Sequence, residues 1–257
     1  MSTTLTYPSA LNKKPSMLTA LSKYDYTALS IPCPSQDIHP VFAKITTAES
    51  GKKISSERIL EIHLRLLSDL YSEKYNRLSI AETSVWKTIT HQLQWFEKES
   101  AFMNYFEDSN VRIIGSRLQK LYRSINASEK ISVSCAHHNF TPWKLNADEN
   151  RLYRFQWETT DCGIPMLTDL FHYFFLRQIV TGYEDYTYVK KSIDASLEFA
   201  EAKKIIRKYK INTLLHFRLY LLFSISHYVR TCINQNVPLV QMHRLMKVWN
   251  EALSDTE

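Results

Sequence analysis

The stretch SCAHHNFTPWKLNADENRLYRFQWETTDCGIPMLTDLFHYF, residues 134–174, decides the fold. It continues from ISVSC (131–135) and contains RLYRFQW (151–157), and the alternating pattern of both segments predicts short β-strands. WKLNADEN lies between them and is typical of a loop and turn. After Pro165 the apolar residues return to helical spacing. The stretch therefore predicts a small β patch over 131–157, set between two groups of helices.

Three amphipathic helices are predicted before the β patch. The first lies in 54–73, the second begins at the capping box SIAE and runs to about Phe106, and the third follows it. In the box, Ser79 and Glu82 would satisfy free amides of the first helical turn. The apolar residues that define the three buried faces are three or four positions apart: Ile59, Ile62, Leu66 and Leu70; Val85, Ile89, Leu93 and Phe96; Val111, Ile114, Leu118, Leu121 and Ile125.

Four more helices are predicted after the patch, over 166–180, 190–209, 211–234 and 238–253. The proline clusters of residues 1–50 show no sustained periodicity, and we interpret this part as an irregular N-terminal arm. Residues 51–257 are expected to form one domain. The fold class is therefore mainly α, of the α+β type, with a small β patch.

Composition places the chain among ordinary soluble globular proteins, since 44% of its residues are hydrophobic and 23% are charged. The most apolar run, 211–229, contains His216, Arg218 and His227, which favours a buried helix over a membrane span. No signal peptide is evident. The four cysteines form no CxxC pair and show neither metal-site nor disulfide spacing, so we expect a reduced, cytoplasmic protein.

The motif HHNFTPWKL, followed by LYRFQWE and GIPMLTDLFHYF, resembles the aminoglycoside phosphotransferase and choline-kinase-like family, particularly its bacterial members tied to cell-surface sugars. That family has His-Gly-Asp, then an Asn, then a strand ending in Asp-Trp-Glu, and later a Pro and an Asp-Leu helix start. The resemblance implies that residues 51–257 are the helical C-terminal lobe of a protein-kinase-like fold. The N-terminal lobe is expected to be absent or vestigial, since only VFAKIT (41–46), with Lys44, offers any likeness to it.

The residues that carry chemistry in that family differ in this chain. His137, His138 and Asn139 occupy the first triplet, Lys144 replaces the Asn, and Gln156 replaces the second Asp. In kinase-type transfer, an Asp accepts the hydroxyl proton, and an Asn and a second Asp hold magnesium. No competent catalytic residue or metal site is therefore predicted at His137, Asn139, Lys144 or Gln156. The framework residues Trp143, Trp157, Pro165 and Asp169 are retained.

Several nearby side chains have alternative roles. His137 and His138 would act as a base or metal pair, or else only orient the loop; Lys144 would hold an anion in place of the lost metal. Glu158 would either ligate a cation or have a purely structural role. The resemblance implies that Asp169 caps its helix and steadies the 137–139 loop. His138, Lys144 and Glu158 are thus the candidate ligand-binding residues.

A basic face is predicted at KKIIRKYK, residues 203–210. Its cations are Lys203, Lys204, Arg207, Lys208 and Lys210. One interpretation is a solvated helix end, where cations suit the helix dipole. The other is a surface for phosphates, nucleic acid or an acidic partner, in keeping with a net charge of +6.

Together these observations predict a catalytically degenerate kinase-like protein, a pseudokinase, that binds a protein partner or serves as its accessory subunit. Family resemblance points to cell-surface polysaccharide biosynthesis, and a small anion or sugar is an alternative ligand. No cofactor is expected. An active phosphotransferase using Mg²⁺ and ATP, completed by a separate small lobe, is the first alternative. A nucleic-acid-binding protein that uses the 203–247 basic face is the second, less favoured one.

Overall fold

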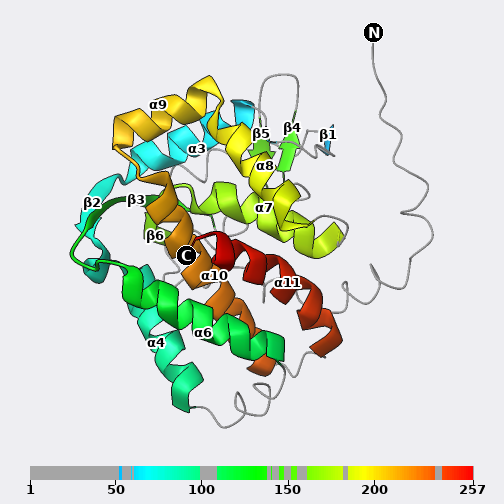
Figure 1. Cartoon of the computed structure of the whole chain (residues 1–257). Coiled ribbons are helices and arrows are strands. Elements are labelled where there is room, and N and C mark those ends of the chain that lie inside the picture. Colours follow the sequence, from blue (N-terminus) through cyan, green and yellow to red (C-terminus); the bar gives the residue numbers. More distant parts are fainter. Residues whose placement is uncertain are drawn as a thin grey trace, which may run out of the picture.

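The computed structural model describes residues 52–53, 59, 61–98, 109–137, 140, 145–147, 152–154, 161–181, 185–234 and 239–256. Within these residues the chain is mainly helical, as the sequence predicts. The α-helices are α3 (Glu61–Glu73), α4 (Ser84–Lys98), α6 (Ser109–Ser124), α7 (Thr168–Thr181), α8 (Tyr186–Leu197), α9 (Ala200–Tyr209), α10 (Thr213–Asn234) and α11 (Leu239–Asp255). Helix α10 runs through the middle of the molecule (Figure 1).

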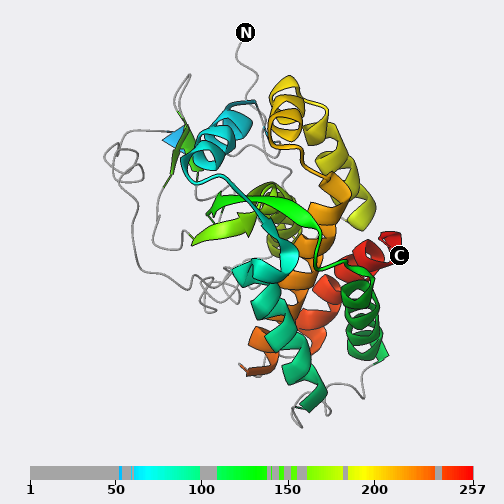
Figure 2. The same cartoon turned by 90° about the vertical axis from the view of Figure 1, so that its left-hand side faces the viewer.

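Two small antiparallel sheets accompany the helices. One consists of β2 (Asn76–Ser79), β3 (Lys130–Ala136) and β6 (Asp161–Pro165), with β3 in the centre. The other consists of β1 (Lys52–Lys53), β4 (Leu145–Ala147) and β5 (Leu152–Arg154), with β4 in the centre. In Figure 2 the β3–β6 pair lies between α3 and α9 on one side and α4 and α10 on the other. This position explains why β3 is buried on both faces beyond its first residue.

The β patch differs in two ways from the one expected over 131–157. Strand β3 pairs with β2 and β6, neither of which was predicted. The strand found within 151–157 pairs in the other sheet with β4, which lies in the WKLNADEN segment that was expected to be a loop and turn. Strand β2 has the sequence NRLS, with its first two residues exposed and its last two half-buried, so it lacks the alternating apolar pattern of a half-buried strand. Its backbone pairing with β3, from Asn76↔Val133 to Ser79↔Lys130, makes it a strand.

The capping box also acts differently from the prediction. The Ser79 amide donates to Glu82 Oε2 at 2.8 Å, but the box begins a single 3₁₀ turn, Ile80–Glu82. Thr83 follows in an extended conformation, and α4 begins at Ser84. The Trp86 amide donates to Thr83 Oγ1 at 3.2 Å, so Thr83 caps the α-helix itself. The predicted continuation to Phe106 lies outside the described residues.

The helix expected over 190–209 is two helices. Phe199 is extended, with φ −57° and ψ 145°, and it separates α8 from α9. The two helices pack on different neighbours: α8 packs on α7 and α11, whereas α9 packs on α3. A straight helix could not reach both surfaces, and the half-buried Phe199 packs against the core at the bend.

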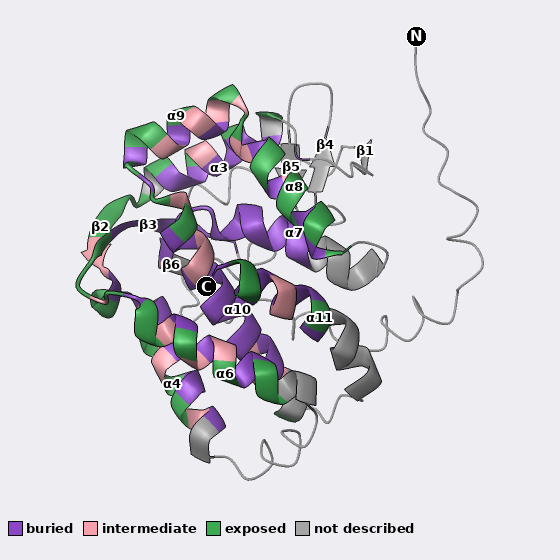
Figure 3. Cartoon of the chain, in the orientation of Figure 1, coloured by how far each residue is buried: buried purple, intermediate pink, exposed green. Residues whose placement is uncertain are grey.

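The core forms where α7 and α10 meet. Phe171 and Phe175 of α7 contact Tyr220 of α10, with ring centroids 5.7 and 5.5 Å apart. Figure 3 shows the first half of α7 and most of α10 buried, and α9 with an exposed outer face. The apolar run expected to form a buried helix is therefore α10, whose start is capped by Asn212 Oδ1, which accepts from the Leu215 amide at 3.1 Å.

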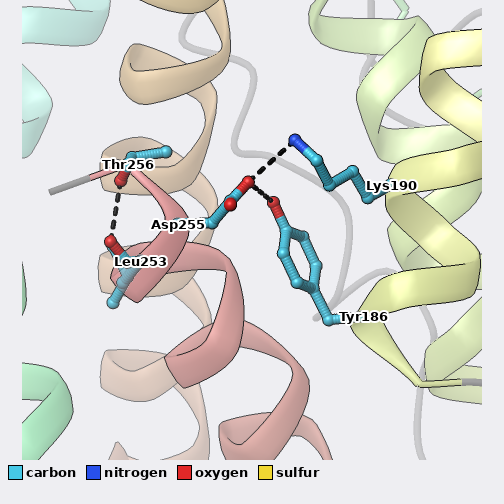
Figure 4. A network of polar contacts seen from close by, with 5 residues as sticks. All are labelled: Tyr186, Lys190, Leu253, Asp255 and Thr256. Carbon is cyan, nitrogen blue, oxygen red and sulfur yellow. Dashed lines mark hydrogen bonds and ion pairs between the residues drawn. The ribbon is translucent and has the colours of Figure 1, made fainter.

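Hydrogen bonds and an ion pair connect the C-terminal helix α11 to α8 (Figure 4). Asp255 Oδ2 accepts from the Tyr186 hydroxyl and from Lys190 Nζ, each at 2.9 Å. The hydrogen bond from Lys190 lowers the pKa of Asp255. Arg218 of α10 donates to the Thr256 carbonyl at 2.7 Å. These contacts hold the end of α11 against two helices that precede it in the chain.

Candidate functional site

Among the catalytic, ligand-binding and supporting residues predicted around the motif, the structure describes His137 and Asp169. His138, Asn139, Trp143, Lys144, Gln156, Trp157 and Glu158 lie outside the described residues. The candidate site is therefore built from the residues that support the 137–140 segment.

His137 follows directly after β3, and its backbone is tied to α7. The His137 amide donates to Asp169 Oδ2 at 2.7 Å, and both residues are buried. Asp169 lies in the first turn of α7, where the helix dipole favours a carboxylate. The contact is the one expected of a residue that steadies this loop.

The turn between β6 and α7 places Asp169 at that position. Val133 of β3 pairs with Pro165, where β6 ends. The Met166 amide then donates to the Ser132 carbonyl at 3.1 Å, and Leu167 adopts a left-handed conformation with φ 69°. Left-handed backbone is rare for a residue such as leucine, and here it reverses the chain into α7.

Tyr71 of α3 supports the same turn, and sequence reasoning missed it. Its hydroxyl accepts from the Leu167 amide at 2.9 Å. Burial raises the pKa of Tyr71, and the negative charge of Asp169 raises it further, so the hydroxyl stays protonated. Tyr71 follows Leu70 in α3. The apolar residues of this helix are three or four positions apart, and that spacing gives no sign that Tyr71 makes a polar contact.

Phe140 anchors the other end of the loop. It is fully buried and lies 6.0 Å from Tyr173 and 6.3 Å from His63, measured between ring centroids. His63 and Tyr173 also contact each other, with centroids 5.8 Å apart. Because His137 and Phe140 are both fixed in the core, the residues on each side of the dipeptide His138-Asn139 are held in place.

At the positions that match the motif of the resembled family, the side chain types do not suit magnesium. Asn139 and Gln156 carry neutral amides and Lys144 carries an ammonium group, whereas Mg²⁺ prefers carboxylate and phosphate oxygens. Within the part of the chain that the structure describes, no three His, Cys, Asp or Glu side chains gather as a metal site would need.

The five cations of the predicted basic face fall into two groups on α9. Lys203 Nζ lies 2.7 Å from Glu198 Oε2, and Lys204 Nζ lies 3.6 Å from Glu201 Oε1. Arg207, Lys208 and Lys210 are exposed, and no ion pair of theirs occurs among the described residues. The basic face is thus confined to the C-terminal end of α9.

The expectation that no cysteine forms a disulfide is wrong for Cys135. This residue is disulfide-bonded and buried, and it lies in β3 at the register shift against β6. The four cysteines are distant in sequence, so their spacing does not show which of them meet in the fold.

The helices among the described residues include none that is both long enough and apolar enough to span a bilayer.

Comparison with known proteins finds no relative of this chain. No family model matches the chain, and neither the curated proteins nor the solved structures include a match. The resemblance to a kinase-like family is therefore carried by the motif residues alone and stays a prediction.

Proposed function

We propose that this chain is a catalytically degenerate kinase-like protein that acts by binding a partner protein. One contrast carries the proposal. The buried hydrogen bond from His137 to Asp169 supports a loop of the kind that carries the catalytic Asp in the resembled family, but the residue at that position is Asn139. In this proposal the support of the segment is kept, and the chemical group is not.

The missing groups explain why binding is favoured over catalysis. An amide such as that of Asn139 cannot accept a proton from a substrate hydroxyl at ordinary pH. Lys144 adds a positive charge where the family would hold a dication, and Gln156 offers a neutral oxygen. Phosphoryl transfer depends on metal and positioned charge, so these three changes together remove its main sources of rate.

The family resemblance also supports the rest of the proposal. It favours an accessory role for an enzyme of cell-surface polysaccharide biosynthesis, without a cofactor. A cytoplasmic location was inferred from the cysteine pattern. The Cys135 disulfide removes that ground, because stable disulfides are typical of oxidising compartments.

The decisive test is a thermal melt with and without ATP and Mg²⁺. A ligand at about 100 times its dissociation constant raises the free energy of unfolding by about 2.7 kcal/mol, which a melt detects easily. We expect no magnesium-dependent shift at roughly millimolar ATP. A clear upward shift would instead support the alternative of an active phosphotransferase.

A restored variant provides the matched control. The triple variant restores the residues of the family motif by Asn139→Asp, Lys144→Asn and Gln156→Asp. If the three positions share one site, the triple variant should gain a magnesium-dependent increase in melting temperature that the wild type lacks. Absence of that gain would show that the three positions do not form the family's site.

A further inference from the structure

Two short segments, distant in sequence, meet on the surface where α3 and α9 end. KYNR (74–77) leads from α3 into β2, and RKYK (207–210) closes α9. We call the two together the tyrosine–cation patch. Their tyrosines join them: the rings of Tyr75 and Tyr209 have centroids 4.9 Å apart. Figure 1 shows α3 and α9 side by side at this end of the molecule.

The patch rests on a fixed base. Tyr209 is buried, its backbone carbonyl accepts from the Ser132 hydroxyl, and its ring lies edge-on to Tyr71 at 6.5 Å. Lys210 then takes a left-handed conformation, φ 51°, and its amide donates to the Arg207 carbonyl at 3.3 Å. A surface held in this way loses little conformational freedom when it binds.

The exposed side chains of the patch include five cations and one aromatic ring. Tyr75 is 44% exposed, an unusual position for a large aromatic residue, and Lys208 Nζ lies 4.8 Å from the centroid of Tyr209. The exposed cations are Lys74, Arg77, Arg207, Lys208 and Lys210. None of the five forms an ion pair with another described residue, in contrast to Lys203 and Lys204 on the same helix.

Helix dipoles account for only part of this arrangement. Cations are stabilised at helix C-termini, which suits Lys74 after α3 and Arg207 in the last turn of α9. The dipole does not explain Arg77, which lies in β2, or the exposed Tyr75. Exposed aromatic residues and Arg together are enriched in protein interfaces.

We propose that the tyrosine–cation patch docks an acidic segment of the partner protein. Carboxylates of that segment would pair with the surrounding Lys and Arg, and an apolar side chain would pack on Tyr75. Single-stranded nucleic acid fits less well, because it stacks successive bases on several exposed aromatic rings and Tyr209 is buried. This inference rests on the proposed function and specifies the chemistry of the partner.

Fluorescence anisotropy with three labelled probes tests the proposal. The probes are a Glu-rich peptide with a central Phe, the same peptide with Gln in place of Glu, and an oligothymidine of similar charge. The acidic peptide should bind most tightly, and its affinity should fall as salt is added. Absence of acidic-peptide binding, or tighter binding of the oligothymidine, would overturn the proposal.

Two charge-matched variants place the site on α9. Arg207→Gln with Lys208→Gln should weaken acidic-peptide binding about tenfold, which corresponds to about 1.4 kcal/mol, because two exposed ion pairs with the peptide are lost. Lys203→Gln with Lys204→Gln removes the same charge from the same helix and should bind nearly as wild type does. Equal weakening in both variants would show that net charge, and not the patch, governs binding.

Tyr75 has its own pair of variants. Tyr75→Phe keeps the ring and should bind the acidic peptide as wild type does, whereas Tyr75→Ser should bind it more weakly. Equal affinity in the two would remove Tyr75 from the docking surface. The outcomes are separable from those of the proposed function, since that proposal fails by magnesium-dependent stabilisation with ATP.

Discussion

Asp169 is the residue on which the candidate loop depends. Its carboxylate accepts from the buried His137 amide, and a buried amide left without an acceptor costs about 1–3 kcal/mol. Asp169→Ala should therefore lower the free energy of unfolding by that amount in a urea titration. Asp169→Asn retains an oxygen acceptor and should lose less. Equal losses in the two variants would show that the carboxylate charge matters more than the hydrogen bond to His137.

His172 gives the fold a defined response to acid. It is buried between α7 and α10, facing His227 and Tyr220, and burial lowers its pKa to about 4, with a smaller contribution from His227. A lowered folded-state pKa means that protonation favours the unfolded chain, so stability is present above the unfolded pKa of 6.5 and falls toward pH 4. From about pH 7 to about pH 5 the loss from this group should be about 2 kcal/mol.

His172→Phe should remove that part of the pH dependence. Some dependence should remain, because burial also lowers the pKa of His216, although its hydrogen bonds to the Asn212 and Ser132 carbonyls oppose the shift. Leu214→Ala, which changes an exposed side chain of α10 that does not titrate, serves as the control and should respond to acid as wild type does. Urea titrations at both pH values measure the difference; an unchanged pH response in His172→Phe would contradict the assignment.

At the residue scale, the sequence predicted which residues support the candidate loop better than it predicted which groups they contact. The motif GIPMLTDLF selected Asp169, whose buried contact to His137 then appeared in the structure. Tyr71 could not be found in the same way, because its partner is a backbone amide that lies 96 positions further along the chain. Hydrogen bonds to distant backbone leave no periodic signal in the sequence.

At the element scale, the helices with regular apolar stripes were the most predictable. Leu118 of α6 lies on such a stripe and is fully buried, whereas Leu214 of α10 is 51% exposed. Leu118→Ala should cost roughly 2–5 kcal/mol through lost burial and a residual cavity. Leu214→Ala makes the same deletion at an exposed site and should change stability by about 0.5 kcal/mol or less. Similar losses in chemical denaturation would mean that the stripe of α6 does not face the core.

The short strands and helix boundaries were the least predictable elements. Strand β2 carries NRLS, whose polar composition gives no strand pattern, and its pairing with β3 depends on where α3 ends. The division of α8 from α9 depends on surfaces of α3, α7 and α11. Local propensity contains no information about such distant neighbours, so tertiary packing decides these boundaries.

At the scale of the whole molecule, the mainly helical class followed from composition and period, but the covalent links did not. Which distant cysteines lie within bonding distance depends on how β3 and its neighbours pack, and the spacing in the sequence does not show it. The bond at Cys135 is therefore a property of the complete fold. It also gives the molecule a dependence on redox conditions that the cysteine spacing did not predict.

The Cys135 disulfide should make the stability of the whole domain sensitive to reducing agents. Cross-links of this kind typically contribute about 2–4 kcal/mol, mainly by restricting the unfolded chain. Dithiothreitol should therefore lower the melting temperature of the wild-type protein. Cys135→Ala, which lacks the cross-link and keeps a small apolar side chain at a buried position, should melt at the same temperature with and without the reductant. Alkylation of Cys135 in unreduced, urea-unfolded protein, detected by mass spectrometry, would show that the residue is a free thiol and would restore the argument for a reduced protein.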